Sequence, residues 1–523
     1  MGDDENLVAQ SHKRTGTAST GSAPHGDGRQ DFVAQSHKGF RPPGSLVTKR
    51  ENGRRWEPVI GLEIHVQLKT KTKMFCRCPA GFGAGENTQT CPVCLGFPGA
   101  LPVANRAAVE WTILLGLALG CGIADRAVFA RKNYFYPDLP KGYQISQYDL
   151  PLCINGKVAV PTAGHDHVIG IVRAHLEEDA AKTIHVGGRT GRIGGADYSL
   201  VDYNRGGTPL VEIVTAPDIH STDQAKRFLQ LLRQTIVELG VSDAEMEKGT
   251  LRVDANVSVR PAGSDELRTR TEIKNMNSFN FIARGIGAEV ERQIAVWESG
   301  GEVKQETYDF DAATGRLTPR RAKEEADDYR YFPEPDLVPI EPPAELVEQL
   351  RAGLPELPAA RIRRLEAELD LERAVVLVTG GLDALWEKAV AAGADRVAAA
   401  NVVANNVVGA GVDPGAVPAK ELARLVDARD RIPRAAFDEA IAKLAEPGFS
   451  ADPYLVEETV SDTAELGPIV ARILEANDDK VAAYRSGKEG LLGFFVGQVM
   501  RETQGKANPR VVSELVRAKL SEG

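Results

Sequence analysis

The chain has 523 residues, of which 42% are hydrophobic and 26% are charged, as expected for a soluble globular protein of about two to four domains. No stretch approaches the roughly 18 uninterrupted apolar residues of a membrane span, and the first residues lack the apolar core of a secretory signal. The formal net charge of -10 argues against a protein that coats nucleic acid, but it leaves room for a local basic surface.

Residues 1–55 are rich in Gly, Ser, Thr and His, and they repeat the sequence VAQSHK at 8–13 and 33–38. Such a biased polar segment does not bury enough apolar surface to fold. We therefore expect a disordered extension without catalytic residues.

The segment 59–68, VIGLEIHVQL, alternates with a period of two, which predicts a β-strand. One face is apolar throughout, while the other carries Glu63 and His65 beside Gly61. A carboxylate and an imidazole placed in this way could hold a divalent cation. The alternative is a half-exposed strand whose polar face only meets water.

Four of the six cysteines cluster as Cys76-x-Cys78 and Cys91-Pro-Val-Cys94. Four thiolates with no histidine or carboxylate leave no open coordination position, so the spacing predicts a structural zinc site. A redox pair or plain buried thiols are the alternatives. The pattern does not resemble a secreted disulfide framework and favours a reducing cytoplasm, while the other two cysteines look like isolated small hydrophobic residues.

Carboxylates recur in later strand-like segments. After the strand predicted at 168–176, an extended chain would place Glu178 on the opposite face from Glu177. In the strand predicted at 209–215, Glu212 stands among apolar residues. A carboxylate in such a strand is costly unless it is paired or bound to a metal.

The clearest alternation predicts a strand over 250–260, and another strand is predicted over 269–274. The polar face of the first mixes cations, a carboxylate and neutral donors, namely Arg252, Asp254, Asn256, Ser258 and Arg260. Such a face suits nucleotide phosphates and a metal, although a merely solvated face is the competing interpretation. The chain has no Walker-type phosphate loop and no nucleophile elbow, so the residue types favour phosphoryl transfer around a metal at a different kind of site.

Two helices are predicted among these strands. One begins at the capping-box pattern that starts with Ser221 and ends at Gly240, and the other covers about 281–297. Because strands and helices do not alternate regularly, we expect an α+β unit over 56–345 rather than a doubly wound parallel sheet.

Helical patterns follow the Pro-rich connection at 334–343 and continue to the end of the chain. They predict a helical domain over 346–460 and a helical tail over 461–523. From Lys480 onward the tail contains eight Lys and Arg residues and only four Glu residues, so it is net positive. This surface could bind phosphates or could simply be a solvated helical face.

Several long motifs occur in one order along the chain. They are GLEIHVQL (61–68), CPVCLGFPGALPVAN (91–105), RKNYFYPDLPKGYQISQ (131–147), HLEEDAAK (175–182), DYNRGGTPLVEIV (202–214), LRVDANVSVR (251–260), TEIKNMNSFN (271–280), DYRYFPEPDL (328–337) and GFFVGQVMRETQGKANP (493–509). From about Glu57 to the C-terminus, the chain resembles the B subunit of the tRNA-dependent glutamyl/aspartyl amidotransferases. One departure is Ala181, where the family usually shows glycine.

The resemblance implies a catalytic fold like that of glutamine synthetase and the guanidino kinases, an antiparallel-sheet cradle, followed by a helical domain and a helical tail that contacts tRNA. It also implies a reaction. In this family the enzyme uses ATP and Mg²⁺ to phosphorylate the side-chain carboxylate of Glu-tRNA(Gln) or Asp-tRNA(Asn), and ammonia then displaces phosphate. The implied partners are an amidase subunit, which releases the ammonia from glutamine, and a small clasp subunit.

The motif positions assign site residues under the same resemblance. The metal and kinase site would contain Glu63, His65, Glu178 and Glu212. The ATP-facing strand would present Arg252, Asp254, Asn256 and Ser258. Lys132 would line the ammonia exit together with Glu178, and the four cysteines would hold the zinc.

Two other functions are weighed against this one. A free-standing carboxylate–amine ligase of the glutamine synthetase type would act on a small molecule without tRNA. A zinc-stabilised RNA-binding protein would bind tRNA without any dependence on ATP. The long helical C-terminal region disfavours the small-molecule ligase.

Overall fold

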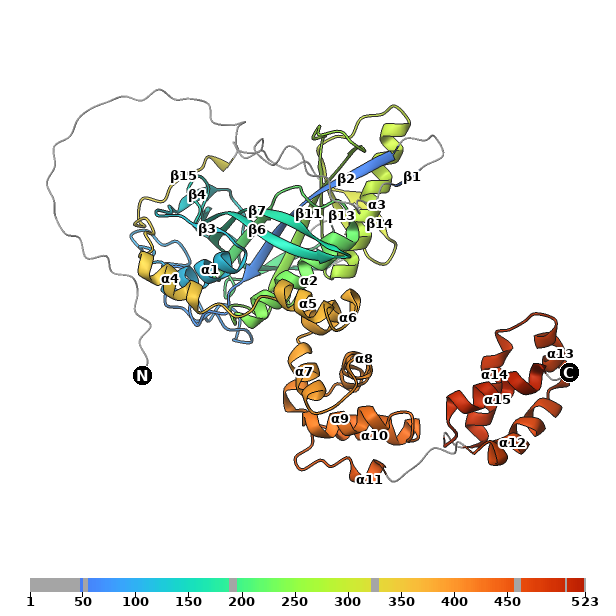
Figure 1. Cartoon of the computed structure of the whole chain (residues 1–523). Coiled ribbons are helices and arrows are strands. Elements are labelled where there is room, and N and C mark those ends of the chain that lie inside the picture. The colour runs from blue at the N-terminus through green and yellow to red at the C-terminus, as the bar shows by residue number, and fades with distance from the viewer. Residues whose placement is uncertain are drawn as a thin grey trace. The chain divides into compact units, whose positions relative to one another are not determined.

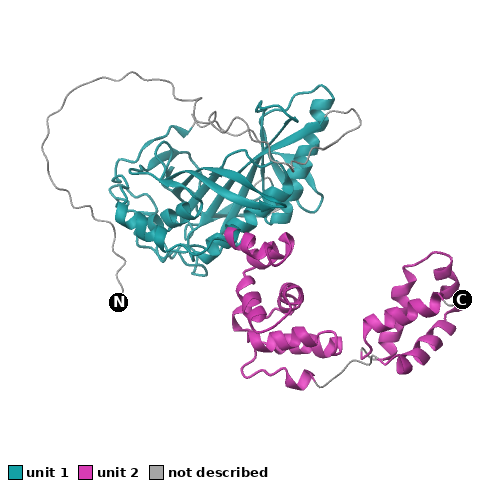
Figure 2. Cartoon of the chain, viewed as in Figure 1, with its two compact units in different colours: residues 1–359 teal, residues 360–523 magenta. Residues whose placement is uncertain are grey.

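The computed structural model describes residues 48–49, 55–187, 195–320, 329–455, 462–503 and 506–521. The chain divides into two compact units, residues 1–359 and 360–523 (Figure 2). The extension expected at 1–55 lies almost entirely outside the described residues. Within the described ranges, no helix is long and apolar enough to cross a membrane.

The first unit is built around one large sheet (Figure 1). Its strand order is β14-β13-β12-β11-β2-β10-β7-β6-β3, and the short β1 pairs with β2. The strands are β1 (Thr48–Lys49), β2 (Arg55–Gln67), β3 (Gly122–Ile123), β6 (Cys153–Thr162), β7 (His165–Glu178), β10 (Pro209–Thr215), β11 (Leu251–Pro261), β12 (Thr271–Lys274), β13 (Thr307–Asp311) and β14 (Arg316–Pro319).

The pairings within this sheet are antiparallel except for β12 with β13, which is parallel. The expectation of an antiparallel sheet is therefore corrected at this pair, and the sheet is mixed. The reason is that the chain returns through helix α3 between β12 and β13, and such a crossover brings the next strand back in the same direction.

Among the described residues of the first unit, two smaller sheets and four complete helices accompany the large sheet. A three-stranded sheet has the order β15-β4-β5, and a hairpin pairs β8 with β9. Their bounds are β4 (Ala130–Asn133), β5 (Tyr143–Ser146), β8 (Lys182–Val186), β9 (Tyr198–Asp202) and β15 (Phe332–Pro333). The helices are α1 (Arg106–Ala118), α2 (Thr222–Glu238), α3 (Phe279–Glu298) and α4 (Ala344–Ala352).

The alternation of apolar and polar residues in β2 determines which face of the large sheet is buried. Ile60, Ile64 and Val66 are fully buried, while Glu63 and His65 are half-buried on the other face. Helix α3 packs against β11 and α2 packs against α3. Burying the apolar face under helices leaves the polar face available for chemistry.

The start of α2 follows the predicted cap with one difference. Ser221 Oγ accepts the Gln224 N–H at 3.1 Å, as an N-cap should. The Gln224 side chain, however, accepts the N–H of His220 at 2.8 Å rather than that of the N-cap residue itself. The cap therefore closes one residue earlier than in the standard capping box.

The second unit is helical, as expected. Its elements are α5 (Pro358–Glu366, which begins in the first unit), α6 (Leu371–Thr379), α7 (Asp383–Ala391), α8 (Arg396–Asn401), a π-helical segment (Val402–Val407), a 3-10 turn (Pro414–Ala416), α9 (Ala419–Ala428), α10 (Arg434–Lys443), α11 (Asp452–Leu455), α12 (Thr463–Glu475), α13 (Asp478–Arg485), α14 (Leu491–Glu502) and α15 (Pro509–Ser521). Helices α12, α14 and α15 share a core of their own that includes Val470, Phe495 and Val516.

Candidate active site

Four residues line up across the polar face of the large sheet. The register pairs Arg252 of β11 with His65 of β2, His65 with Glu212 of β10, and Glu212 with His175 of β7. Residues in register on adjacent strands share a face, so their side chains are neighbours. Segments up to 187 residues apart in sequence, from 65 to 252, thus meet in one row.

His65, Glu177 and Glu212 form a compact group. The His65 Nε2 atom lies 3.5 Å from Glu177 Oε1 and 3.5 Å from Glu212 Oε2. One ligand atom from each residue lies within 4.8 Å of the others. Carboxylates suit Mg²⁺ or Mn²⁺, while an imidazole is more typical of transition metals. This donor set fits one divalent cation that keeps several water ligands.

Burial and charge control protonation in this group. Burial alone would lower the pKa of His65, but the hydrogen bond to Glu212 and the charges of Glu177 and Glu212 raise it to about 9. Burial raises the pKa of Glu177 to about 7. Burial also opposes ionisation of Glu212, but His175 and His65 hold its pKa well below its usual value. Near neutral pH a His65 cation therefore faces the Glu212 carboxylate.

A second row of polar residues lies two positions along the strands. Asp254 of β11 is directly opposite Glu63 of β2, and like charges in that position repel each other unless they are compensated. Lys274 forms an ion pair with Asp254. Asn256 Nδ2 donates a 2.9 Å hydrogen bond to Glu63 Oε1. Among the described residues, Lys274 is the only cation that pairs with Glu63 or Asp254, so together these two carboxylates add negative charge beside His65.

The remaining predicted nucleotide-facing residues differ in their surroundings. Ser258 is buried, and its Oγ donates to the carbonyl of Val59 at 3.5 Å. Arg252 Nη2 lies 3.0 Å from Asp179 Oδ2. Arg173 Nη2 lies 3.8 Å from Glu212 Oε1. The two arginines therefore border the carboxylate group, whereas Ser258 is tied to the backbone of β2.

Four buried nitrogen atoms around this group have no hydrogen-bond partner within the part of the chain that the structure describes. They are Arg173 Nε, His175 Nδ1, Arg252 Nε and Arg252 Nη2, the last of which forms only the ion pair with Asp179. Buried donors without partners are costly. An anion with several acceptor oxygens, such as a phosphate group, is the ligand that would satisfy them.

Glu178 lies on the other face of β7. Its carboxylate forms an ion pair with Lys141 and accepts a 3.0 Å hydrogen bond from the Ile145 N–H. Both side chains line a cavity of about 50 Å³ together with Cys94 and Gly207. A cavity of this size holds a few water-sized molecules.

The expected grouping of the metal ligands is corrected by this geometry. The structure does not bring Glu178 to His65 and Glu212, because consecutive residues of a strand point to opposite faces. Glu177 takes its place. Glu63 lies on the same face as His65 but in the neighbouring row. The strand predicted around residues 175–178 places the side chains of Glu177 and Glu178 on opposite faces. It does not indicate which of the two lies on the same face as Glu212 of β10.

Lys132, expected to line the ammonia exit together with Glu178, does not contact Glu178 directly. Lys132 lies on β4, where its Nζ atom is 4.8 Å from the ring centroid of Tyr329 and 5.9 Å from that of Tyr134. Lys141, from the same motif, pairs with Glu178 instead. Lys132 lies within a short strand and Lys141 precedes one, and only the folded turn between β4 and β5 decides which of them reaches β7.

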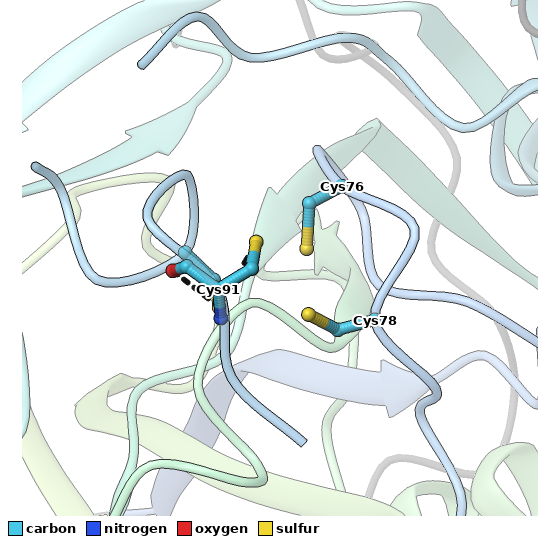
Figure 3. A group of neighbouring side chains, drawn as sticks. Cys76, Cys78 and Cys91 are labelled. Carbon is cyan, nitrogen blue, oxygen red and sulfur yellow. Dashed lines mark hydrogen bonds between the residues drawn. The ribbon is translucent and has the colours of Figure 1, made fainter. Parts of the chain in front are cut away.

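The four cysteines come together as their spacing predicts. Their sulfur atoms all lie within 4.8 Å of one another, and those of Cys91 and Cys94 are 3.9 Å apart. Sulfurs around a tetrahedral zinc, each about 2.3 Å from the metal, are about 3.8 Å apart. Figure 3 shows the sulfurs of Cys76, Cys78 and Cys91 turned toward one another. The thiol set therefore fits zinc.

The surroundings of Cys94 favour its thiolate form. The hydrogen bond with Cys76, with further help from the backbone of Cys91 and the charge of Lys73, lowers the pKa of Cys94 to about 4. Lys73 is fully buried, with its Nζ atom 3.7 Å from Cys94 Sγ and donating to the Tyr203 carbonyl at 3.1 Å. A buried cation beside the cysteines offsets the charge of a thiolate-bound metal.

The loop of the second cysteine pair also contacts the Glu178 site. Gly96 has φ +69°, and a Cβ atom there would lie 2.9 Å from the Cα atom of Lys141. Only glycine allows this approach. The cysteine loop thus holds Lys141 next to Glu178.

Two family models match the chain. Residues 58–348 match the family model described as the GatB/GatE catalytic domain. Residues 384–520 match the family model described as the GatB domain.

Full-length relatives are similar over most of the chain. The B subunit of the aspartyl/glutamyl-tRNA(Asn/Gln) amidotransferase of Syntrophotalea carbinolica is 47% identical over 485 residues, covering 89% of this chain and 99% of that protein. The protein of the same name from Geobacter sulfurreducens is 49% identical over 480 residues, covering 89% and 99%. That of Thermobifida fusca is 47% identical over 510 residues, covering 93% and 98%.

Proposed function

Because this chain belongs to the family of aspartyl/glutamyl-tRNA(Asn/Gln) amidotransferase B subunits, which are glutamine-dependent carbon–nitrogen ligases of translation, we propose that it activates and amidates tRNA-bound carboxylates. Its substrates would be Glu-tRNA(Gln), Asp-tRNA(Asn) or both. An amidase subunit would supply ammonia from glutamine, and a small clasp subunit would join the two large ones. A cytoplasmic location follows from this role in translation.

The proposed chemistry explains why a site with no covalent nucleophile suffices. A carboxylate is a poor electrophile, so an oxygen of the substrate carboxylate attacks the γ-phosphorus of ATP and ADP leaves. In the acyl phosphate the carboxylate no longer spreads a negative charge over the acyl carbon, and phosphate is available as the leaving group. Ammonia then attacks the acyl carbon and phosphate leaves, which gives the side-chain amide.

The group of His65, Glu177 and Glu212 is the observation that carries this proposal. These residues would hold the Mg²⁺ that neutralises phosphate charge, and Glu63 would extend the negative surface for it. A buried and a half-buried carboxylate share one histidine here, so their combined negative charge exceeds what one imidazolium neutralises, and a cation would supply the rest.

The arginines of the same face would hold the phosphates. Arg173 and Arg252 each have a buried Nε atom with no partner within the described residues. Asp254 and Asn256 lie in the neighbouring row, where they would position the nucleotide or its metal. Ser258 would act less directly, since its hydroxyl is bonded to the backbone of β2.

The cavity beside Glu178 and Lys141 would carry the ammonia. Ammonia is about as large as water, so a cavity of about 50 Å³ has room for it. The carboxylate and ammonium groups, both nearly buried, offer an acceptor and a donor to a small polar molecule. Glu178 is adjacent in sequence to Glu177, so the exit would lie on the reverse side of the strand that carries the metal site.

The structural parts around the site have supporting roles in the proposal. The cysteines would hold a structural zinc that fixes the loop next to Lys141. The likeness to glutamine synthetase and the guanidino kinases is supported by a mostly antiparallel sheet with one polar face. The basic residues of α13, α14 and α15 would bind tRNA, although Arg485 also donates to the carbonyl of Leu520 at 3.1 Å.

The test is a transamidation assay of the assembled complex with each mischarged tRNA separately. We expect Gln-tRNA(Gln), Asn-tRNA(Asn) or both to form in a reaction that needs ATP and glutamine, and Glu212→Gln to abolish it. Failure with both tRNAs would overturn the proposal. Amidation of a small carboxylate without tRNA would favour a free-standing ligase. Binding of tRNA with no ATP-dependent product would favour a plain RNA-binding protein.

A further inference from the structure

A cluster of four tyrosines, Tyr134, Tyr148, Tyr329 and Tyr331, lies at the edge of the three-stranded sheet; we call it the tyrosine wall. The rings of Tyr148 and Tyr331 are stacked, with centroids 4.2 Å apart and planes 11° apart. Tyr331 meets Tyr329 edge-on at 6.3 Å, and Tyr329 meets Tyr134 edge-on at 6.0 Å. The wall therefore joins two segments that are far apart in the sequence.

Hydrogen bonds and an ion pair hold the two segments of the wall together. Asn133 Nδ2 donates to the carbonyls of Tyr329 and Arg330 at 3.2 and 2.8 Å. Arg131 binds Glu334 through two hydrogen bonds of 2.7 and 2.8 Å. Rings that are fixed before a ligand arrives lose little conformational freedom on binding.

The wall borders the carboxylate group of the candidate active site. Strand β5, which pairs with the strand before Tyr134, binds the end of β7, since Gln144 Nε2 donates to the Glu178 carbonyl at 2.8 Å. Gln147, the residue before Tyr148, accepts a 3.1 Å hydrogen bond from the N–H of Leu176, the residue before Glu177. The chain at Tyr148 therefore lies beside the part of β7 that carries Glu177.

Tyr148 is the open end of the stack. This residue is 45% exposed, and Tyr331, which is half-buried, supports its ring from behind. An exposed, supported aromatic ring is the platform on which an unpaired nucleic-acid base stacks.

We propose that the terminal base of the unpaired 3′ end of the aminoacylated tRNA stacks on Tyr148 and thereby brings the esterified amino acid to the group of His65, Glu177 and Glu212. This inference rests on the proposed function. The amino acid is esterified to the 3′-terminal ribose, so the terminal base lies no farther from the reacting carboxylate than one amino acid and one sugar. Tyr148 acts here as a positioning residue.

The competing ligand for the same ring is the adenine of ATP. The wall favours the RNA end because it offers several aromatic rings in a row, as single-strand sites do, whereas one adenine needs only one ring. The test below separates the two.

The experiment uses the chain assembled with its partner subunits and a mischarged tRNA that carries 2-aminopurine as its 3′-terminal base. We expect its fluorescence to fall on binding, because stacking quenches it. In Tyr148→Leu the quenching should disappear and the KM for the mischarged tRNA should rise about tenfold. The kcat should stay within about twofold and the KM for ATP should not change.

Two variants control for folding and for general loss of aromatic surface. Tyr148→Phe keeps the ring and should restore quenching and KM. Phe135→Leu removes an exposed ring, 81% accessible, from the loop between β4 and β5, and should change neither.

The outcomes distinguish this inference from the proposed function. If the wild-type complex transamidates the tRNA but shows no quenching, or if Tyr148→Leu raises only the KM for ATP, the stacking inference is wrong and the proposed function stands. If the wild-type complex forms no amidated tRNA at all, the proposed function fails and this inference falls with it.

Discussion

The guanidinium of Arg131 and the carboxylate of Glu334, 203 residues apart in sequence, form a two-point ion pair with hydrogen bonds of 2.7 and 2.8 Å. The Glu334 side chain is fully buried and that of Arg131 is 20% exposed. The pair fastens β15 to β4 and with it the segment that carries Tyr329 and Tyr331.

Breaking this pair should destabilise the first unit. Glu334→Ala leaves Arg131 with only the more exposed Asp336 as an ion-pair partner, so we expect the free energy of unfolding to fall by about 2 kcal/mol or more. Urea denaturation of the full chain measures it. The control is Arg126→Ala, which breaks an exposed pair with Glu341 and should cost at most about 1 kcal/mol. Equal effects of the two substitutions would contradict the structural role given to Glu334.

Substitutions of the adjacent residues Glu177 and Glu178 should impair amidation in different ways. Glu177→Gln removes a carboxylate from the metal group, so the rate of ATP-dependent amidation should fall about 100-fold with any ammonia source. Glu178→Gln removes the partner of Lys141 in the small cavity, so the reaction should fail with glutamine but persist with added ammonium chloride. Amidation rates measured with both nitrogen sources separate the two. The same defect in both variants would mean that the two faces of β7 do not have separate tasks.

Binding of Mg²⁺ should depend on pH in a defined direction. The pKa of His65 is raised to about 9, so below pH 9 the metal-free chain holds a proton where a cation would bind. The metal must displace that proton, and its affinity should rise as the pH increases from 7 to 9 and then level off. Calorimetry in two buffers of different ionisation enthalpy measures the protons released. His65→Asn should leave only the protons that come from Glu177, whose pKa is about 7, so the release at pH 8 and above should nearly vanish. An affinity that is flat over this pH range would exclude His65 as a ligand.

Two glycines of the cysteine loop provide a matched pair. Gly96 and Gly99 both have positive φ, +69° and +83°, so alanine is strained by about 1 kcal/mol at either position. At Gly96 the new Cβ atom would also meet Lys141, whereas nothing lies within 4 Å of one at Gly99. Gly96→Ala should therefore lower the thermal midpoint further and impair the glutamine-dependent reaction, while Gly99→Ala should show only the strain. Thermal denaturation and the amidation assay check this, and indistinguishable variants would rule out the contact.

Local patterns in the sequence account for much of the fold. The period of two correctly predicted the strands that became β2, β7, β10, β11 and β12, and the Ser221 cap correctly began α2. These signals depend on neighbours a few residues away, where alternation and capping are decided. The pattern missed short strands such as β4 and β15, because two to four residues carry no period.

The site was harder to predict because it depends on long-range pairing. Strand β2 lies between β10 and β11, and this order brings Glu212 and Arg252 to opposite sides of His65. Nothing local encodes that order. The choice between Glu177 and Glu178 likewise depends on which face of β7 meets the polar side of the sheet, and the motif contains both.

Replacing one cysteine of the four should remove the zinc. In Cys91→Ser a hydroxyl replaces a thiolate in a site whose sulfurs already lie within 4.8 Å of one another. We expect the zinc content to fall from about one ion per chain to near zero and the thermal midpoint to drop, because the site closes the loop around residues 76–94. Elemental analysis of the purified chain measures the metal. Cys121→Ser, at a buried cysteine outside the cluster, should keep the zinc even if it lowers stability. A full zinc content in Cys91→Ser would show that the metal binds elsewhere, and zinc-free wild-type protein would leave the four thiols as a packing or redox cluster.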